Sequence, residues 1–166
     1  MIKLTTIASA LVLAGTVAAA AASPKPIDEF GYWGAFTYDD AKRGKLCYAL
    51  SVPQAKAPED RNHGDVYFVV SAKSGGKAFE PQIEVGYPLK PDADVSVEVG
   101  GKKFAMFSNA NNAWLKDTKN SDALIAAMRK GRKMKVNGVS KKGTRTTYTY
   151  SLSGVTAALK AISACK

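Results

Sequence analysis

Few residues in this sequence have the types and the spacing that enzyme chemistry requires. His63 is the only histidine, so a catalytic triad of the Ser-His-Asp or Cys-His type would have to use it. It lies between Asn62 and Gly64 in a segment rich in Pro, Gly and Asp, which is typical of an exposed loop. Ser74 and Lys77 have the S-x-x-K spacing, but two glycines separate them and no S-D-N or K-T-G motif accompanies them. We therefore interpret both motifs as parts of loops.

Other signatures of catalysis are absent from the sequence. It contains no P-loop, dinucleotide fingerprint, G-x-S-x-G elbow or H-E-x-x-H motif. One histidine and two cysteines are too few ligands for a typical zinc site. We therefore expect a protein that is not an enzyme and that needs no cofactor and no metal. A small hydrolase that uses two of the 14 scattered carboxylates stays open as a rival interpretation.

The N-terminus has the pattern of a secretory signal peptide. Lys3 precedes an apolar run from Leu4 to Val17, and Ala20-Ala21-Ala22 offers a cleavage site before Ser23. The alternative, an uncleaved membrane anchor, is less favoured because Thr, Ser and Gly interrupt the run. No later stretch is apolar enough to span a bilayer. We expect a signal peptide at 1–22, a single β-rich domain at 23–166, and export to the periplasm, the outer surface or the medium.

Export gives the two cysteines a structural interpretation. Cys47 and Cys165 are the only possible pair, and disulfides persist in oxidising compartments. The pair closes a loop of 118 residues, for which the chain-entropy model gives a stabilisation of about 4 kcal/mol. A redox pair would normally have the C-x-x-C spacing, which is absent. We therefore predict a structural disulfide between Cys47 and Cys165.

Positive charge is concentrated in the second half of the chain. From Ser23 to Gly100 the sequence has 9 basic and 12 acidic residues, whereas from Gly101 to Lys166 it has 14 basic and 2 acidic ones. Eight basic residues fall within seventeen positions: Arg129, Lys130, Arg132, Lys133, Lys135, Lys141, Lys142 and Arg145. This cluster predicts a surface that binds an anionic partner, such as lipopolysaccharide, phospholipid head groups, an acidic glycan or an acidic protein. The alternative is a solvated surface without a partner.

Nucleic acid is not the expected partner. An exported protein meets little of it, and the sequence has neither an RNA-binding aromatic signature nor a helix-turn-helix. The aromatic residues near the N-terminus, with Trp33 among them, and the later Trp114 are best explained by core packing and strand anchoring. A ligand groove at the rim of the fold is the alternative for these aromatic side chains.

The elements that must position these residues are mostly strands. Period-two alternation, broken by Gly, Pro, Asn and Asp, predicts eight of them: Phe30–Tyr38, Leu46–Val52, Val66–Ser71, Gln82–Gly86, Val95–Val99, Lys103–Ser108, Lys133–Val139 and Thr144–Leu152. We expect a mostly β fold, an antiparallel β-sandwich of about eight strands with one short inserted helix and a C-terminal helix packed on the sheet.

Two segments have helical periodicity. Asp122–Lys130 follows Asn120-Ser121, either of which can cap it, and Gly154–Ala164 follows Ser153 as the expected cap. In the strand that holds Cys47, Ala49 and Ser51 share its face. These small side chains would let the C-terminal helix approach closely, and the disulfide would then hold its end. That packing requires the two cysteine Cα atoms to lie within about 7 Å.

Several of these segments together resemble the bacterial invasion-associated locus B family. The resemblance covers the whole domain after the signal peptide, and its C-terminal part is the more specific. The matching residues are Trp33-Gly34, Cys47-Tyr48, Ser51, Pro53, Gly86-Tyr87, Trp114, the helix LIAAMRKG at 124–131, MKVNGVS at 134–140, GTRTTYTYSLSG at 143–154, and Ala164-Cys165. Tyr148 stands where family members often carry an acidic residue, so no role of a carboxylate there carries over.

The resemblance implies a small exported protein of Gram-negative bacteria, linked to host-cell invasion and with no known catalytic residues. The two cysteines fit the pattern of the family. We therefore expect a non-enzymatic protein that acts in invasion or at the envelope and binds an anionic partner through its basic surface. The alternative is a periplasmic inhibitor or accessory partner of an envelope enzyme, which would bind through loops and aromatic residues such as Trp114 or Tyr87.

Overall fold

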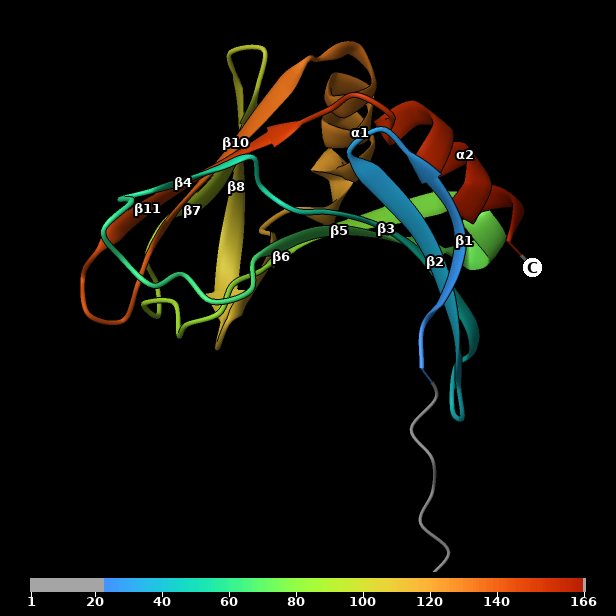
Figure 1. Ribbon diagram of the computed structural model, residues 1–166, viewed down its shortest axis with the longest axis horizontal. Helices are drawn as coiled ribbons and strands as arrows, with labels where there is room; N and C mark the ends of the chain where they lie inside the picture. The colour runs from blue at the N-terminus through green and yellow to red at the C-terminus, as the bar shows by residue number, and fades with distance from the viewer. Residues whose placement is uncertain (1–22, 166) are drawn as a thin grey trace, which may run out of the picture.

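The computed structural model describes residues 23–165, which form one antiparallel sheet with helices on it (Figure 1). The predicted signal peptide, 1–22, lies outside these residues. The strand order is β1-β2-β3-β5-β6-β9-β8-β7-β10-β11-β4. The strands are β1 (Lys25–Phe30), β2 (Trp33–Asp40), β3 (Gly44–Ser51), β4 (Ala55–Ala57), β5 (Tyr67–Lys73), β6 (Ala78–Glu84), β7 (Val95–Val99), β8 (Lys102–Asn109), β9 (Asn112–Leu115), β10 (Lys133–Val139) and β11 (Arg145–Ser151).

The predicted fold class is confirmed: the protein is mostly β, antiparallel, and has one inserted and one C-terminal helix. The structure has eleven strands rather than eight, and their hydrogen-bonded pairing is continuous. A strongly twisted sheet of this size curls, and the curl brings side chains from distant strands face to face. The packing expected between two sheets is thus made by the two halves of a single sheet.

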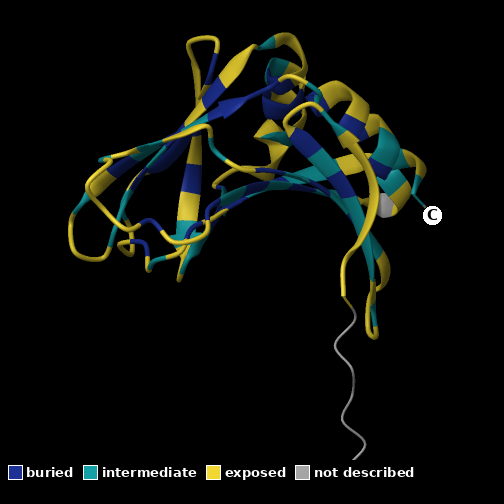
Figure 2. Ribbon diagram, viewed as in Figure 1, coloured by how far each residue is buried: buried dark blue, intermediate teal, exposed yellow. Residues whose placement is uncertain are grey.

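Contacts between β2, β5 and β11 show how far the sheet curls. The indole Nε1 of Trp33 donates to the carbonyl oxygen of Ser151 at 3.0 Å. The rings of Trp33 and Phe68 meet edge to face, and so do those of Phe68 and Tyr150. All three side chains are fully buried, and the strands alternate between buried and exposed residues (Figure 2). One contiguous core therefore lies inside the curl.

Three strands were not predicted from the sequence. β1 is almost entirely exposed and lacks alternation, β4 has only three residues, and β9 begins in the asparagine-rich segment. The predicted strand Phe30–Tyr38 is divided by a turn at Gly31-Tyr32, so Phe30 ends β1 and Trp33 begins β2. The edge strands β1 and β4 bury too little surface to impose a period-two pattern, whereas β9 alternates but is only four residues long.

Two α-helices cover the inner face of the curled sheet. α1 (Ser121–Lys130) buries Leu124, Ile125 and Met128 and contacts β6 and β7. α2 (Val155–Ala164) lies on β1, β2 and β3 (Figure 1). A short 3-10 helix, η2 (Thr118–Asn120), leads into α1, and a second, η1 (Ser74–Gly76), joins β5 to β6.

The predicted helix caps are confirmed only in part: Asn120 is the N-cap residue of α1, but Gly154 rather than Ser153 is that of α2. Neither Asn120 nor Ser153 caps a helix with its side chain, and the hydroxyl of Ser121 donates instead to the carbonyl oxygen of Phe79. Gly154 precedes α2 with a φ of 95°, and a Cβ there would overlap the carbonyl oxygen of Phe30. Close contact with β1, rather than side-chain capping, therefore determines where α2 begins.

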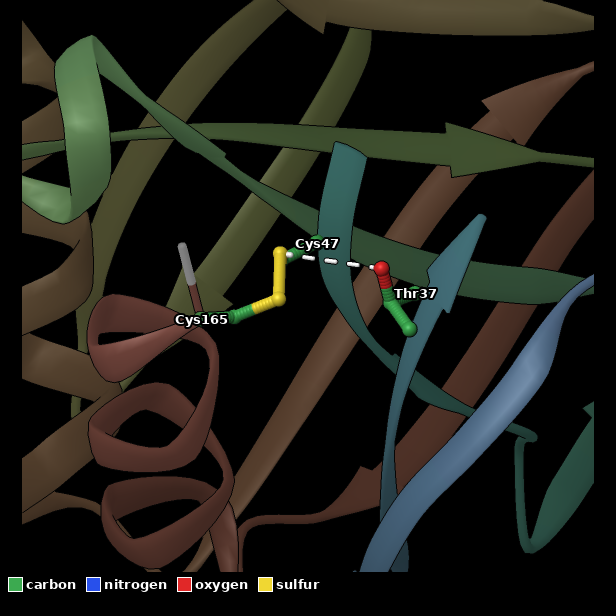
Figure 3. The surroundings of a disulfide bond; sticks show 3 residues. All are labelled: Thr37, Cys47 and Cys165. Atoms are coloured by element: carbon green, nitrogen blue, oxygen red, sulfur yellow. Dashed lines mark hydrogen bonds between the residues drawn. A yellow bond between two sulfur atoms is a disulfide. The ribbon is translucent and has the colours of Figure 1, made fainter. Parts of the chain in front are cut away.

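The predicted disulfide and the packing of α2 are confirmed. Cys47 and Cys165 are bonded, and their Cα atoms are 6.2 Å apart (Figure 3). Cys47, Ala49 and Ser51 are buried on the inner face of β3, as the alternation predicts. The Thr37 hydroxyl on β2 lies 3.9 Å from the Cys47 sulfur. The bond thus ties the end of α2 to the strand on which the helix packs.

We predict that the variant Cys47→Ala/Cys165→Ala is less stable than the oxidised protein by about 4 kcal/mol, because the unfolded chain regains the freedom of a 118-residue loop. Urea denaturation followed by circular dichroism measures this difference. Dithiothreitol should lower the midpoint of the native sequence and leave that of the variant unchanged. Equal midpoints for the variant and the oxidised protein would contradict the prediction.

Candidate functional site

The eight basic residues singled out in the sequence lie at two ends of the β10–β11 hairpin. Arg129 and Lys130 end α1, and Arg132 and Lys133 follow directly. The other end holds Lys141, Lys142 and Arg145, with Lys135 in between. The six residue steps along β10 from Lys133 to Val139 place the two groups about 20 Å apart. All eight side chains are exposed, but only the first group lies against α1.

Gly131 allows the first group to form. A Cβ at this position would lie 2.6 Å from Val99 Cγ1 and 2.9 Å from Leu152 Cδ1. The chain can therefore leave α1 pressed against the sheet and enter β10 two residues later. Arg132 and Lys133 follow the end of the helix directly, so they lie beside Arg129 and Lys130. Both side chains are exposed.

Sequence reasoning missed two further cations of this region. Lys102, on the β7–β8 hairpin, lines a hollow of about 290 Å³ together with Lys130. Lys77, which directly precedes β6, lines a second hollow of about 570 Å³ with Arg129 and Lys130. Both lysines follow glycine turns distant in sequence from α1, so only the folded chain brings them near it. We call Lys77, Lys102, Arg129, Lys130, Arg132 and Lys133 the basic end of α1.

The charges of the basic end of α1 are not neutralised by ion pairs. Within residues 23–165, none of its six cations forms a salt bridge; the four pairs found lie elsewhere in the fold. The Arg129 guanidinium lies 5.8 Å from the centre of the Phe79 ring, a cation–π arrangement. Asp122, in the first turn of α1, is the one acidic residue that lines the hollow formed by Lys77, Arg129 and Lys130. This end of the molecule is therefore strongly positive.

A larger groove, of about 680 Å³, borders the start of α1. Trp114 and Phe107 stack there with ring centres 5.8 Å apart, and Phe107 is 46% exposed. The Trp114 indole donates to Gln82 Oε1 at 3.1 Å, and the Gln82 amide donates to Asn112 Oδ1 at 2.7 Å. Trp33 is a core residue as expected, whereas Trp114 is only half-buried and its ring lines the groove.

His63 is not the exposed loop residue that its surroundings predict. Its side chain is only 6% exposed. Its Nε2 lies 2.8 Å from the carbonyl oxygen of Pro58, and its Nδ1 lies 2.9 Å from the hydroxyl of Tyr148. The Tyr148 hydroxyl also contacts that of Tyr87, which reaches Thr146. The imidazole therefore anchors the loop before β5 to β11, and the tyrosines Tyr87 and Tyr148 are structural.

These contacts fix the direction of every hydrogen bond in the network when His63 is neutral. The Pro58 carbonyl can only accept, so Nε2 carries the proton and Nδ1 accepts from Tyr148. The Tyr148 oxygen then accepts from Tyr87, which accepts from Thr146. Burial raises the pKa of the Tyr148 hydroxyl, and the hydrogen bond with Tyr87 adds to the shift. The network lies inside the fold and does not border the grooves described above.

The remaining features considered from the sequence are a metal site, the S-x-x-K motif and a membrane-spanning segment. Among the described residues, no group of three or more His, Cys, Asp or Glu side chains is placed to hold a metal ion. The Ser74–Lys77 segment is the turn that contains η1, as its glycines indicate. No helix within residues 23–165 is long and apolar enough to cross a bilayer.

Residues 33–163 match the model of the invasion associated locus B (IalB) protein family, which covers most of the chain. The chain belongs to this family. No curated protein and no solved structure matches it. The family match begins at Trp33, whose indole joins the two halves of the curled sheet, and it ends within α2. The residues that match the IalB family therefore include the closed core, the strand that carries Cys47 and all of α1.

We predict opposite outcomes for two neighbouring tyrosines of this IalB chain. Tyr148→Phe leaves the Nδ1 of His63 without a partner and removes one of the two partners of the Tyr87 hydroxyl, so it should lower the free energy of unfolding by about 1–3 kcal/mol. The buried hydroxyl of Tyr150 has no partner among the described residues. Tyr150→Phe should therefore cost little or increase stability. Urea denaturation at neutral pH measures both, and a greater loss for Tyr150→Phe would refute the network.

The two buried tyrosines, Tyr148 and Tyr150, should also make the stability of the protein depend on pH in the alkaline range. The pKa values of Tyr148 and Tyr150 are raised above 10 by burial, so the unfolded chain loses these protons first as the pH rises. The free energy of unfolding should therefore fall above about pH 10, by about 1.4 kcal/mol per pH unit for each such group. Each Phe variant should show a shallower fall than the native sequence. Identical slopes in the three proteins would contradict these shifts.

Proposed function

We propose that this IalB protein is an exported binding protein, without chemistry of its own, that attaches to an anionic partner through the basic end of α1. One observation carries the proposal: six cations from three separate segments gather around the end of one helix, and none is neutralised by an ion pair among the described residues. Unpaired cations on a firm scaffold attract anionic surfaces and polymers.

Export is supported by two features. The sequence begins with a signal-peptide pattern, and a disulfide such as that between Cys47 and Cys165 persists in an oxidising compartment. A role in host-cell invasion or at the bacterial envelope is part of the proposal, because the description of the family names invasion. The candidate partners are an anionic envelope component, an anionic host-surface component and an acidic protein.

The alternative, an accessory partner or inhibitor of an envelope enzyme, receives one supporting observation. Phe107 and Trp114 form an accessible aromatic surface, and such side chains dominate many protein interfaces. Tyr87, the other aromatic residue considered for that role, is held in the His63 network. Binding through the aromatic surface would resist salt, whereas binding through the basic end of α1 would not.

A charge-reversal experiment tests the proposal with a matched control. We predict that Lys130→Glu/Arg132→Glu/Lys133→Glu weakens binding to phosphatidylglycerol vesicles and to heparin on the order of a hundredfold at low salt. The control, Lys141→Glu/Lys142→Glu/Arg145→Glu, changes the net charge equally at the far end of the hairpin. It should retain most of the affinity, and both triple variants should melt near the native temperature because all six side chains are exposed.

Vesicle co-sedimentation and heparin titration, each repeated from low to high salt, give the affinities. Equal losses in the two triple variants would show that only net charge matters and would refute a defined site. Native binding that does not weaken as salt rises would also contradict the proposal.

A further inference from the structure

Two adjoining hollows beside α1 together make a groove along the helix. The aromatic groove at the start of the helix and the hollow beside Arg129 share Phe79 and Asp122. α1 has ten residues, so it is about 15 Å long. A single extended ligand could therefore contact the aromatic residues at one end and the cations at the other.

The aromatic end is shaped for an uncharged ligand with both apolar and hydroxyl groups. Trp114 is fixed by Gln82, which is fixed by Asn112, so the ring needs no ordering on binding. Two cations, Lys73 and Lys119, and two carboxylates, Glu80 and Asp122, line this groove, so its formal charge is zero, and Lys73 pairs with Glu80 at 3.0 Å. Sugar rings have the required chemistry, because their C–H faces pack on aromatic rings while their hydroxyls bond to polar side chains at the edge. Asn109 and Thr118 are polar side chains on that edge.

The other end is shaped for an anion. Lys77, Arg129 and Lys130 line it, and Arg129 lies over the Phe79 ring that both hollows share. Asp122 lies where the hollows meet, and its carboxylate is favoured there by the N-terminal end of the helix dipole. An anionic group on the ligand would thus be repelled near Asp122 and attracted beyond it.

We infer that this groove binds an acidic glycan, with uncharged sugar rings on Trp114 and Phe107 and a carboxylate, phosphate or sulfate group at Arg129 and Lys130. The inference rests on the proposed function, since the cations belong to the basic end of α1. A flat membrane surface would reach the exposed cations without entering the groove, and an acidic peptide would gain little from a neutral aromatic end. The combination of the two ends selects the glycan.

The protein contains its own reporter for the test. It has two tryptophans, and Trp33 is 1% exposed, so a ligand-induced change in emission reports Trp114. The probes are hyaluronan oligosaccharides and the same oligosaccharides with methyl-esterified carboxylates. We expect the acidic form to shift the emission and protect it from acrylamide quenching, and the ester to bind at least tenfold more weakly.

Variants separate the two ends. Phe107→Ala should weaken hyaluronan binding roughly fivefold or more and leave binding to phosphatidylglycerol vesicles unchanged. The control, Tyr32→Ala, removes an equally exposed aromatic ring outside this groove and should change neither affinity. Asp122→Asn should tighten hyaluronan binding, because it removes the repulsion between the hollows.

The outcomes distinguish the inference from the proposed function. Salt-sensitive vesicle binding, with no change in Trp114 emission and no effect of Phe107→Ala on hyaluronan affinity, would overturn the groove and leave the basic surface standing. Equal binding of the acid and the ester would overturn the anionic end. If the native protein bound neither vesicles nor hyaluronan, the groove and the proposed function would both be overturned.

Discussion

The structure depends on one constraint: a single continuous sheet must bury its apolar face against itself. Trp33 is the side chain that meets this constraint most directly, because its indole donates to the Ser151 carbonyl on β11 while its ring packs on Phe68. The hydroxyl of Ser51 reinforces the junction by donating to the backbone of Tyr32, and the amide of Tyr32 donates to the carbonyl of Ser153. These contacts hold the end of β11, and the start of α2 that follows it, against β2 and β3.

The candidate binding surfaces follow from that closure. α1 connects β9 to β10 and lies against β6 and β7, so it joins the two halves of the sheet where they curl together. Its first turn borders the aromatic groove, and its last turn borders the cations. The helix therefore positions both ends of the proposed site, while the disulfide and the His63 network stabilise other parts of the fold.

Strand bounds and the direction of buried side chains can be predicted from the sequence where the local alternation of apolar and polar residues determines them. The bounds of Val95–Val99 and Lys133–Val139 agree with β7 and β10, because apolar residues recur at every second position in both segments and those residues are buried. The pairing of Cys47 with Cys165 follows from the cysteine count, and the inward direction of Cys47 from the same alternation.

The rest depends on contacts that the sequence does not encode locally. Lys141 and Lys142 are near Lys133 in sequence but lie beyond the far end of β10, whereas Lys77 and Lys102 join the basic end of α1 from distant turns. His63 has the neighbours of a loop residue, and only its partners Pro58 and Tyr148 explain its burial.

The most direct test of a single binding site along α1 is an NMR titration of the isotope-labelled, oxidised protein with hyaluronan oligosaccharides. We predict shifts of the Trp114 indole signal and of the Lys77, Arg129 and Lys130 amides, together and with one affinity, and no shifts at Lys141, Lys142 and Arg145. Shifts centred on the β10–β11 turn, or shifts of the lysine and arginine amides without the Trp114 signal, would contradict a single binding site along α1.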